Sequence, residues 1–158
     1  MNGGLQNIRR LKMAIDLKSQ SSMSSLIVII GAIIGIASVF ITWYSVSDFG
    51  FTYSMTGWDI YSQGKDFNGG YFIWMPLLTL IFSVIALLSG LVYFAVRQKA
   101  INLISILFGI LIIVAAILYA TYSSDGDSLY NYLGIGVYLA IISGLLVIIS
   151  GALASKAE

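Results

Sequence analysis

The sequence predicts an all-α integral membrane protein: a bundle of four transmembrane helices with both termini inside and a short first outer loop resembling a β-hairpin. Of its 158 residues, 59% are hydrophobic and 9% are charged, whereas a soluble domain carries about 25% charged residues. The apolar residues fall in four blocks without a charged side chain. Each block approaches the ~20 residues that a helix needs to cross ~30 Å of hydrocarbon.

The four blocks are expected to be helices, because hydrocarbon offers no partner to backbone polar groups and the apolar runs are unbroken. A transmembrane domain is expected over residues 24–154, with spans at about 24–42, 72–96, 101–120 and 133–154 and outer loops at 43–71 and 121–132. Residues 1–23 and 155–158 are then the cytoplasmic ends. Pro76, the only proline, lies in the first two turns of the second span, where its missing N–H costs little.

Charge predicts the orientation of the four spans. Seven of the eight basic residues lie in the N-terminal segment, the second connection or the C-terminal tail, and Lys65 is the exception. Five of the seven acidic residues lie in the two other connections. The positive-inside rule therefore predicts a multi-pass protein of the cell membrane with both termini in the cytoplasm.

The N-terminal segment is expected to form a short helix on the cytoplasmic leaflet over residues 5–18. Leu5, Ile8, Leu11 and Ile15 share one side, and the basic residues Arg9, Arg10, Lys12 and Lys18 surround it as candidate contacts to the lipid bilayer. A second interpretation is that these charges only set the topology. Residues 19–25, SQSSMSS, are expected to be a flexible joint and N-cap. The first span is too long for a signal-peptide core and lacks a small-x-small cleavage site, so we expect it to be retained.

The first outer loop mixes aromatic, hydroxyl and glycine residues. Tyr44 and Val46, with Phe51, Tyr53 and Met55, alternate with small polar residues, which predicts a hairpin that turns near residues 48–50. All three tryptophans and nine of the ten tyrosines fall at or beyond the outer boundary, where amphipathic rings are favoured. The candidate outer-loop contacts are Trp43, Trp58, Asp59 and Tyr61.

This loop resembles that of the claudin-like tetraspan membrane proteins, which have a Trp at its start and a Gly-Leu-Trp followed by two cysteines. Trp43 matches the first tryptophan, and Gly57-Trp58 matches the second element without its leucine. The chain has no cysteine, and the loop is shorter than that family's β-sheet domain. The resemblance covers topology and three residues; it implies a role in organising complexes at the cell surface and no site residues.

In the second outer loop, Asp125 and Asp127 are candidate ligands of a cation such as Ca²⁺, although Asp-Gly-Asp is also ordinary turn chemistry. The sequence has no Cys and no His, which removes thiol and imidazole catalysis and leaves only the outer aspartates with Lys65 as a catalytic cluster. We therefore expect no enzyme and no cofactor. A net charge of +1 predicts no nucleic-acid partner.

Small residues recur along one face of every span, which lets helix backbones approach closely in lipid. The candidate packing residues are Gly31, Gly35, Ala86, Gly90, Gly109, Gly136, Ala140 and Gly144. They predict either one tightly packed bundle or a face for self-association. The short connections predict that consecutive spans are antiparallel neighbours.

Two functional hypotheses follow from these surfaces. The first is a non-enzymatic membrane protein that acts by helix packing and outer-loop contacts, either as an accessory subunit of a larger membrane complex or as a self-associating tetraspan; charged groups inside the membrane, which mark transport pathways, are absent from its spans. The alternative is a homo-oligomeric channel or transporter component. Its pore would be lined by span hydroxyls such as Thr79, Ser83, Ser105, Ser143 and Ser150, with Asp48 or Asp125 at the mouth.

Overall fold

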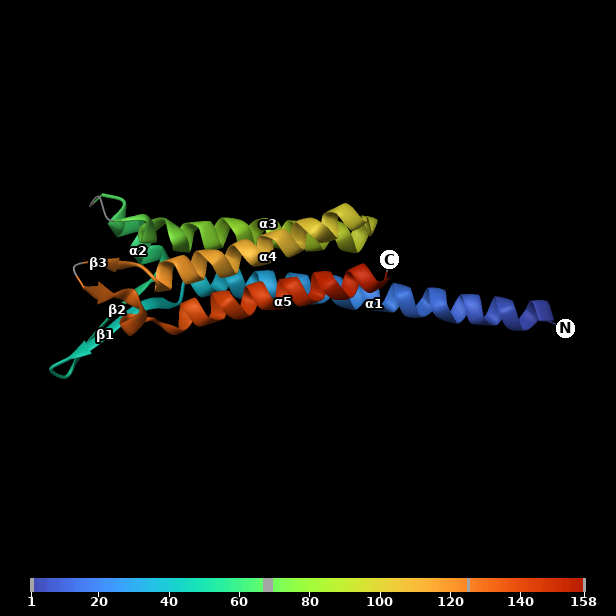
Figure 1. The fold of residues 1–158 in the computed structure, drawn as a ribbon, viewed down its shortest axis with the longest axis horizontal. Coiled ribbons are helices and arrows are strands. Elements are labelled where there is room, and N and C mark those ends of the chain that lie inside the picture. Colours follow the sequence, from blue (N-terminus) through green and yellow to red (C-terminus); the bar gives the residue numbers. More distant parts are fainter. Residues whose placement is uncertain (1, 67–69, 125, 158) are drawn as a thin grey trace.

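The chain forms a helical bundle with small β-hairpins at one end, as a computed structural model of residues 2–66, 70–124 and 126–157 shows (Figure 1). In chain order the elements are α1 (Asn2–Val39), β1 (Thr42–Asp48), β2 (Phe51–Thr56), α2 (Gly57–Gly64), the 3-10 helix η1 (Tyr71–Ile73), α3 (Trp74–Val96), α4 (Lys99–Ala120), β3 (Ser123–Ser124), β4 (Asp127–Ser128), the 3-10 helix η2 (Leu129–Tyr132) and α5 (Ile135–Ala157). The end with the β-hairpins is called the hairpin end below.

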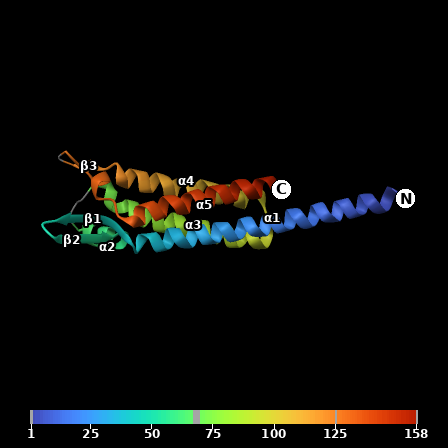
Figure 2. The same ribbon diagram turned by 90° about the horizontal axis from the view of Figure 1, so that it is seen from below.

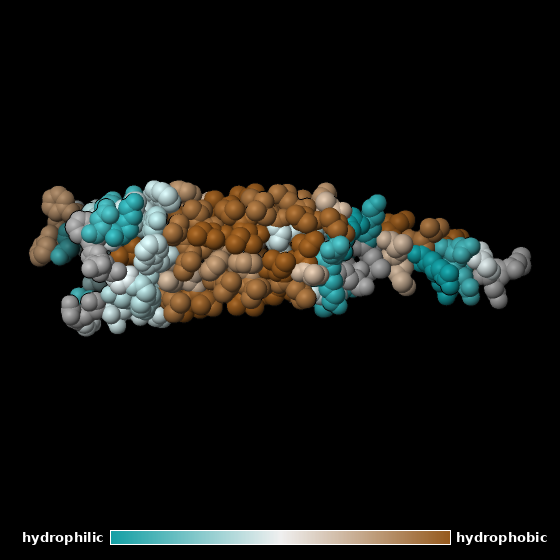
Figure 3. Space-filling model, turned by 90° about the horizontal axis from the view of Figure 1, so that it is seen from above, coloured by the Kyte–Doolittle hydropathy of each residue, from teal (hydrophilic) through white to brown (hydrophobic). Residues whose placement is uncertain are grey.

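Four of these helices are long and apolar enough to cross a membrane, within Gly3–Val39, Tyr71–Val96, Lys99–Ala120 and Ile135–Lys156. Each packs against two others, in the cyclic order α1, α3, α4, α5 (Figures 1 and 2). Consecutive spans are therefore neighbours, as the short connections predict. Figure 3 shows a hydrophobic band around the middle of the bundle with hydrophilic residues at both ends. That pattern is compatible with an integral multi-pass membrane protein.

The predicted packing residues lie inside this single bundle. All eight are buried between helices of the same chain, and the outward positions carry large aliphatic side chains. Gly109 on α4 and Gly144 on α5 form one of the close approaches: a Cβ atom on Gly144 would lie 2.7 Å from the backbone oxygen of Gly109. Small residues are therefore required here because the two backbones are almost in contact.

Hydroxyl and amide side chains join the helices across the bundle. Ser143 and Ser150 on α5 donate hydrogen bonds to the backbone oxygens of Gly31 (2.7 Å) and Ser24 (2.8 Å) on α1. Ser89 on α3 and Ser105 on α4 share a hydrogen bond of 2.7 Å. The hydroxyls proposed above as pore lining are thus buried within one chain. Among the residues that the structure describes, only Ser83 has a fully enclosed side-chain polar atom without a hydrogen-bond partner.

Asn102, which the sequence analysis did not single out, connects α4 to the end of α5. Its buried side-chain amide donates to the Gly151 backbone oxygen at 2.8 Å and to the Ser155 hydroxyl at 2.9 Å. A lone amide in an apolar span is the sequence signal for such a contact, because it must find a partner inside the membrane.

We expect Asn102→Leu to lower the free energy of unfolding by about 1 kcal/mol, within the range measured for polar contacts between membrane helices. Leucine has a similar size but removes the amide that donates to the Gly151 carbonyl and to the Ser155 hydroxyl. Steric-trapping measurements in lipid bicelles would test this. Ser155→Ala, which removes only one of the two contacts, should cost less; equal stability of Asn102→Leu and the unmodified chain would contradict the expectation.

The N-terminal segment differs from the prediction. Residues 19–25 are not a joint but part of α1, which runs unbroken and projects beyond the other helices (Figure 1). The reason is local and tertiary: Ser24 and Ser25 donate back to the backbone oxygens of Gln20 and Ser21, at 2.9 and 3.0 Å, and Ser24 also accepts from α5. These serines satisfy their hydroxyls inside the helix instead of ending it. The predicted short helix is therefore continuous with the first span, and its side chains from residue 3 to 16 are exposed.

The first loop contains the predicted hairpin. Strands β1 and β2 are antiparallel and pair Asp48 with Phe51, so the turn consists of Phe49 and Gly50. Tyr44 pairs with Met55 and Val46 with Tyr53, which places the predicted alternating residues on one face. The hairpin is only two strands, and it is followed by the helix α2, which was not predicted.

Candidate functional site

The β1–β2–α2 segment (residues 42–64), called the cap below, is held to the bundle by Trp43. The register of the hairpin shifts between Thr42 and Tyr44, and this bulge turns Trp43 inward, where its side chain is fully buried. Its indole N–H donates to the Ser38 backbone oxygen at 2.8 Å, and its own backbone oxygen accepts from Gly134 at 2.8 Å. The expected surface contact by Trp43 is thereby corrected: this ring closes the end of α1 and is enclosed by the protein.

Helix α2 begins with a reciprocal cap between Thr56 and Asp59. The Thr56 hydroxyl accepts from the Asp59 backbone N–H, and the Asp59 carboxylate accepts from the Thr56 backbone N–H, both at 3.1 Å. The Thr56 hydroxyl also donates to that carboxylate at 2.8 Å. The Thr-x-x-Asp spacing was the sequence signal for this helix start. Asp59 therefore has a structural role at the helix terminus.

Trp58 and Tyr61, the other predicted contacts, belong to a row of aromatic rings at the end of the hydrophobic band. Trp58 lies 6.2 Å from Phe40 and 5.7 Å from Tyr61, and Tyr61 lies 5.6 Å from Trp74, between ring centroids. Trp58 and Trp74 are partly exposed. Such rings suit the boundary between hydrocarbon and water.

A cavity of about 240 Å³ lies under the cap. Its lining is drawn from β1, β2, α2, η1, α4 and η2: Tyr44, Met55, Ile60, Phe72, Tyr119 and Leu129. Tyr119 packs edge-on against Trp43, with ring centroids 5.0 Å apart. The pKa of Tyr44 is raised above its ordinary value of 10.0, chiefly by burial and further by the nearby Tyr132, Tyr53 and Asp127. Tyr44 is therefore neutral at pH 7 and can form hydrogen bonds.

The tip of the hairpin carries the most exposed aromatic side chains among the residues that the structure describes. Phe49 is 93% exposed, and its neighbour Phe51 is exposed as well. Phe49 has a φ of 46° and Gly50 a φ of 83°. A two-residue turn with positive φ at both positions favours Asn-Gly, whereas an aromatic residue in this conformation is strained. The turn was predicted from the alternation of residues, but its strain has no signal in that pattern.

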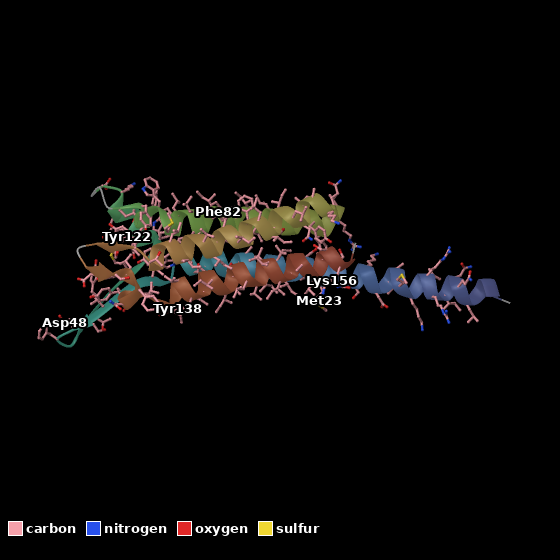
Figure 4. The ribbon with its side chains drawn as sticks, in the orientation of Figure 1. Met23, Asp48, Phe82, Tyr122, Tyr138 and Lys156 are labelled. Atoms are coloured by element: carbon pink, nitrogen blue, oxygen red, sulfur yellow. The ribbon has the colours of Figure 1, made fainter. Side chains whose placement is uncertain are left out.

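The acidic residues of this end do not form a described metal site. Asp59 is engaged in the α2 cap, Asp48 lies near the hairpin tip (Figure 4), and Asp127 lines a second cavity beside Tyr44. Asp125 lies outside the described residues. Among residues 2–66, 70–124 and 126–157, no three acidic, His or Cys side chains are grouped to hold a metal ion.

All the basic residues except Lys65 lie at the opposite end. Arg9, Arg10, Lys12 and Lys18 are exposed on the projecting part of α1. Lys156 is at the same end of the bundle (Figure 4), and the Arg97 guanidinium donates to the Ser22 hydroxyl at 3.3 Å. The two ends of the molecule thus differ in charge and in chemistry.

The fold and the cap define a small four-helix protein of membrane-spanning character, with an aromatic hairpin at one end and a basic helical extension at the other. Compared with protein-family models, curated proteins and solved structures, the chain matches none.

Proposed function

We propose that this protein is a non-enzymatic accessory subunit of a membrane complex and that the tip of its β1–β2 hairpin contacts the partner protein. The observation that carries the proposal is Phe49, a large apolar side chain that is 93% exposed and held at a φ of 46°. Neither the hydrophobic effect within the chain nor the turn geometry favours phenylalanine there. A contact outside the chain would provide the compensating gain.

The same reasoning favours a partner at the hairpin over self-association through the helices. The small residues that would permit close helix approach are buried inside one bundle. The outward helix faces carry aliphatic side chains such as Leu88, Leu107 and Ile149, which suit lipid. A partner subunit is therefore proposed to reach the protein at the hairpin end.

The proposed orientation places the hairpin outside the cell and both termini in the cytoplasm. It is supported by the separation of most basic residues, at one end, from most acidic residues, tryptophans and tyrosines, at the other. The partner would then present an apolar pocket for Phe49 and Phe51 on its own extracellular surface.

We expect Phe49→Asn to abolish partner binding while leaving the fold intact. Asparagine removes the aromatic ring but suits the turn, so the variant should be as stable as the original or more stable by up to about 1 kcal/mol. Native mass spectrometry of the tagged full chain, extracted gently from its own membranes, would report bound partners, and thermal unfolding in the same detergent would report stability.

Tyr130→Asn is the matched control, because Tyr130 is a similarly exposed aromatic residue of the same end but lies on η2. This variant should retain the partner. A complex that survives Phe49→Asn, or a chain that never co-purifies with another protein, would refute the accessory role at the hairpin.

A further inference from the structure

The cavity under the cap is large enough for a small ligand. An engineered cavity of about 150 Å³ lined by aliphatic and aromatic side chains binds benzene, and this cavity has about 240 Å³. Four of its six lining residues have apolar side chains, the other two are tyrosines, and none is charged. Because a charge would lose its hydration here without a counter-charge, the lining selects a neutral, mainly apolar molecule.

A buried tyrosine hydroxyl distinguishes this cavity from an ordinary packing gap. Tyr119 is only 1% exposed, and its hydroxyl finds no hydrogen-bond partner among the residues that the structure describes. A buried tyrosine hydroxyl ordinarily has a partner. Unlike the enclosed hydroxyl of Ser83, Tyr119 lines an open space that a second molecule can enter.

We propose that this cavity is a binding site for a neutral small molecule with an apolar body of about the size of a substituted benzene ring and one hydroxyl or carbonyl oxygen, which Tyr119 hydrogen-bonds. The same chemistry is found in free small molecules and in the ester region of a membrane lipid. This site is separate from the hairpin tip, and the proposal does not depend on a protein partner.

The test uses the buried Trp43 as a reporter, because its ring packs against Tyr119. The other two tryptophans are replaced in a Trp58→Phe/Trp74→Phe background of the full chain in lipid nanodiscs. 4-Bromophenol and bromobenzene are matched ligands that differ by one hydroxyl, and bromine quenches indole fluorescence at close range. Free ligand is measured by equilibrium dialysis, so that partition into lipid is accounted for.

We expect saturable quenching of Trp43, with 4-bromophenol binding about tenfold more tightly than bromobenzene, as one neutral hydrogen bond predicts. Tyr119→Phe should remove this tenfold difference while bromobenzene still binds. Tyr138→Phe, at a tyrosine on the exposed face of α5, should preserve it. Quenching that rises linearly without saturation, or a tenfold difference that persists in Tyr119→Phe, would overturn the proposal.

A second arm distinguishes the two sources of the ligand. Nanodiscs of lipid brominated at carbons 6 and 7 of one chain are compared with unbrominated ones, before and after 4-ethylphenol is added. Quenching of Trp43 that 4-ethylphenol relieves would assign the site to a lipid. Quenching that it does not relieve, or none, would assign the site to a free small molecule.

Discussion

Trp43→Ala is expected to lower the free energy of unfolding by about 3–5 kcal/mol, the usual cost of removing a fully buried tryptophan. Three contributions combine at this residue. The indole ring is completely enclosed and packs on Tyr119, and its N–H satisfies the Ser38 carbonyl at the end of α1. Without the ring, the hairpin loses its attachment to the bundle and a cavity remains.

Thermal unfolding and steric trapping of the purified variant would measure this effect. Trp58→Ala is the matched control, because Trp58 is 42% exposed and lies on the surface of α2. It should cost about 1 kcal/mol or less, which is typical of a change away from the core. Similar losses for the two variants would contradict the assignment of Trp43 as the internal anchor of the cap.

Gly144→Ala is expected to destabilise the bundle by about 1–3 kcal/mol, the range for overpacking a close-packed site. The new Cβ atom would lie 2.5 Å from Ile113 Cγ1 and 2.7 Å from the Gly109 backbone oxygen. The isoleucine side chain can move, but the backbone oxygen cannot move without separating α4 from α5. Gly144→Val should therefore be worse than Gly144→Ala.

The comparison variant is Gly4→Ala, since a Cβ atom there meets nothing within 4 Å. Alanine has the higher helix propensity, by about 1 kcal/mol, so Gly4→Ala should leave stability unchanged or increase it. Melting temperatures of the three purified variants in one detergent would establish the order. If Gly144→Ala melted at the temperature of the original chain, the close approach of α4 and α5 would be refuted.

The prediction of four apolar helices is confirmed because each span depends on a local property. Long uncharged runs must satisfy their backbone hydrogen bonds internally in hydrocarbon, whatever surrounds them. The hairpin was also predictable, since alternation around Tyr44 and Tyr53 and the Gly50 turn are encoded within a few residues. The signal for the start of α2 also lies within a few residues, because the spacing of Thr56 and Asp59 marks this helix terminus.

The predictions that were wrong concern residues whose conformation or burial depends on partners that are distant in the sequence. The segment SQSSMSS has the composition of a flexible joint, yet it is part of helix α1. Ser150 of α5 donates a hydrogen bond to the Ser24 backbone oxygen in this segment. Tryptophan is typical of the membrane boundary, but the bulge in β1 turns the Trp43 side chain into the core. The cavity beside Tyr119 depends on six separate elements and has no signature in any one of them.

The number of spans, their helical state and the hairpin can be predicted from the sequence, because hydropathy and turn chemistry act over short distances. The packing of the elements against one another sets which surfaces are used internally and which remain open. It placed Gly31 and Gly35 inside the bundle, enclosed Trp43 and left Phe49 exposed at the tip. The physical reason is that burial is a property of packed elements, which a single segment does not possess before its neighbours are in place.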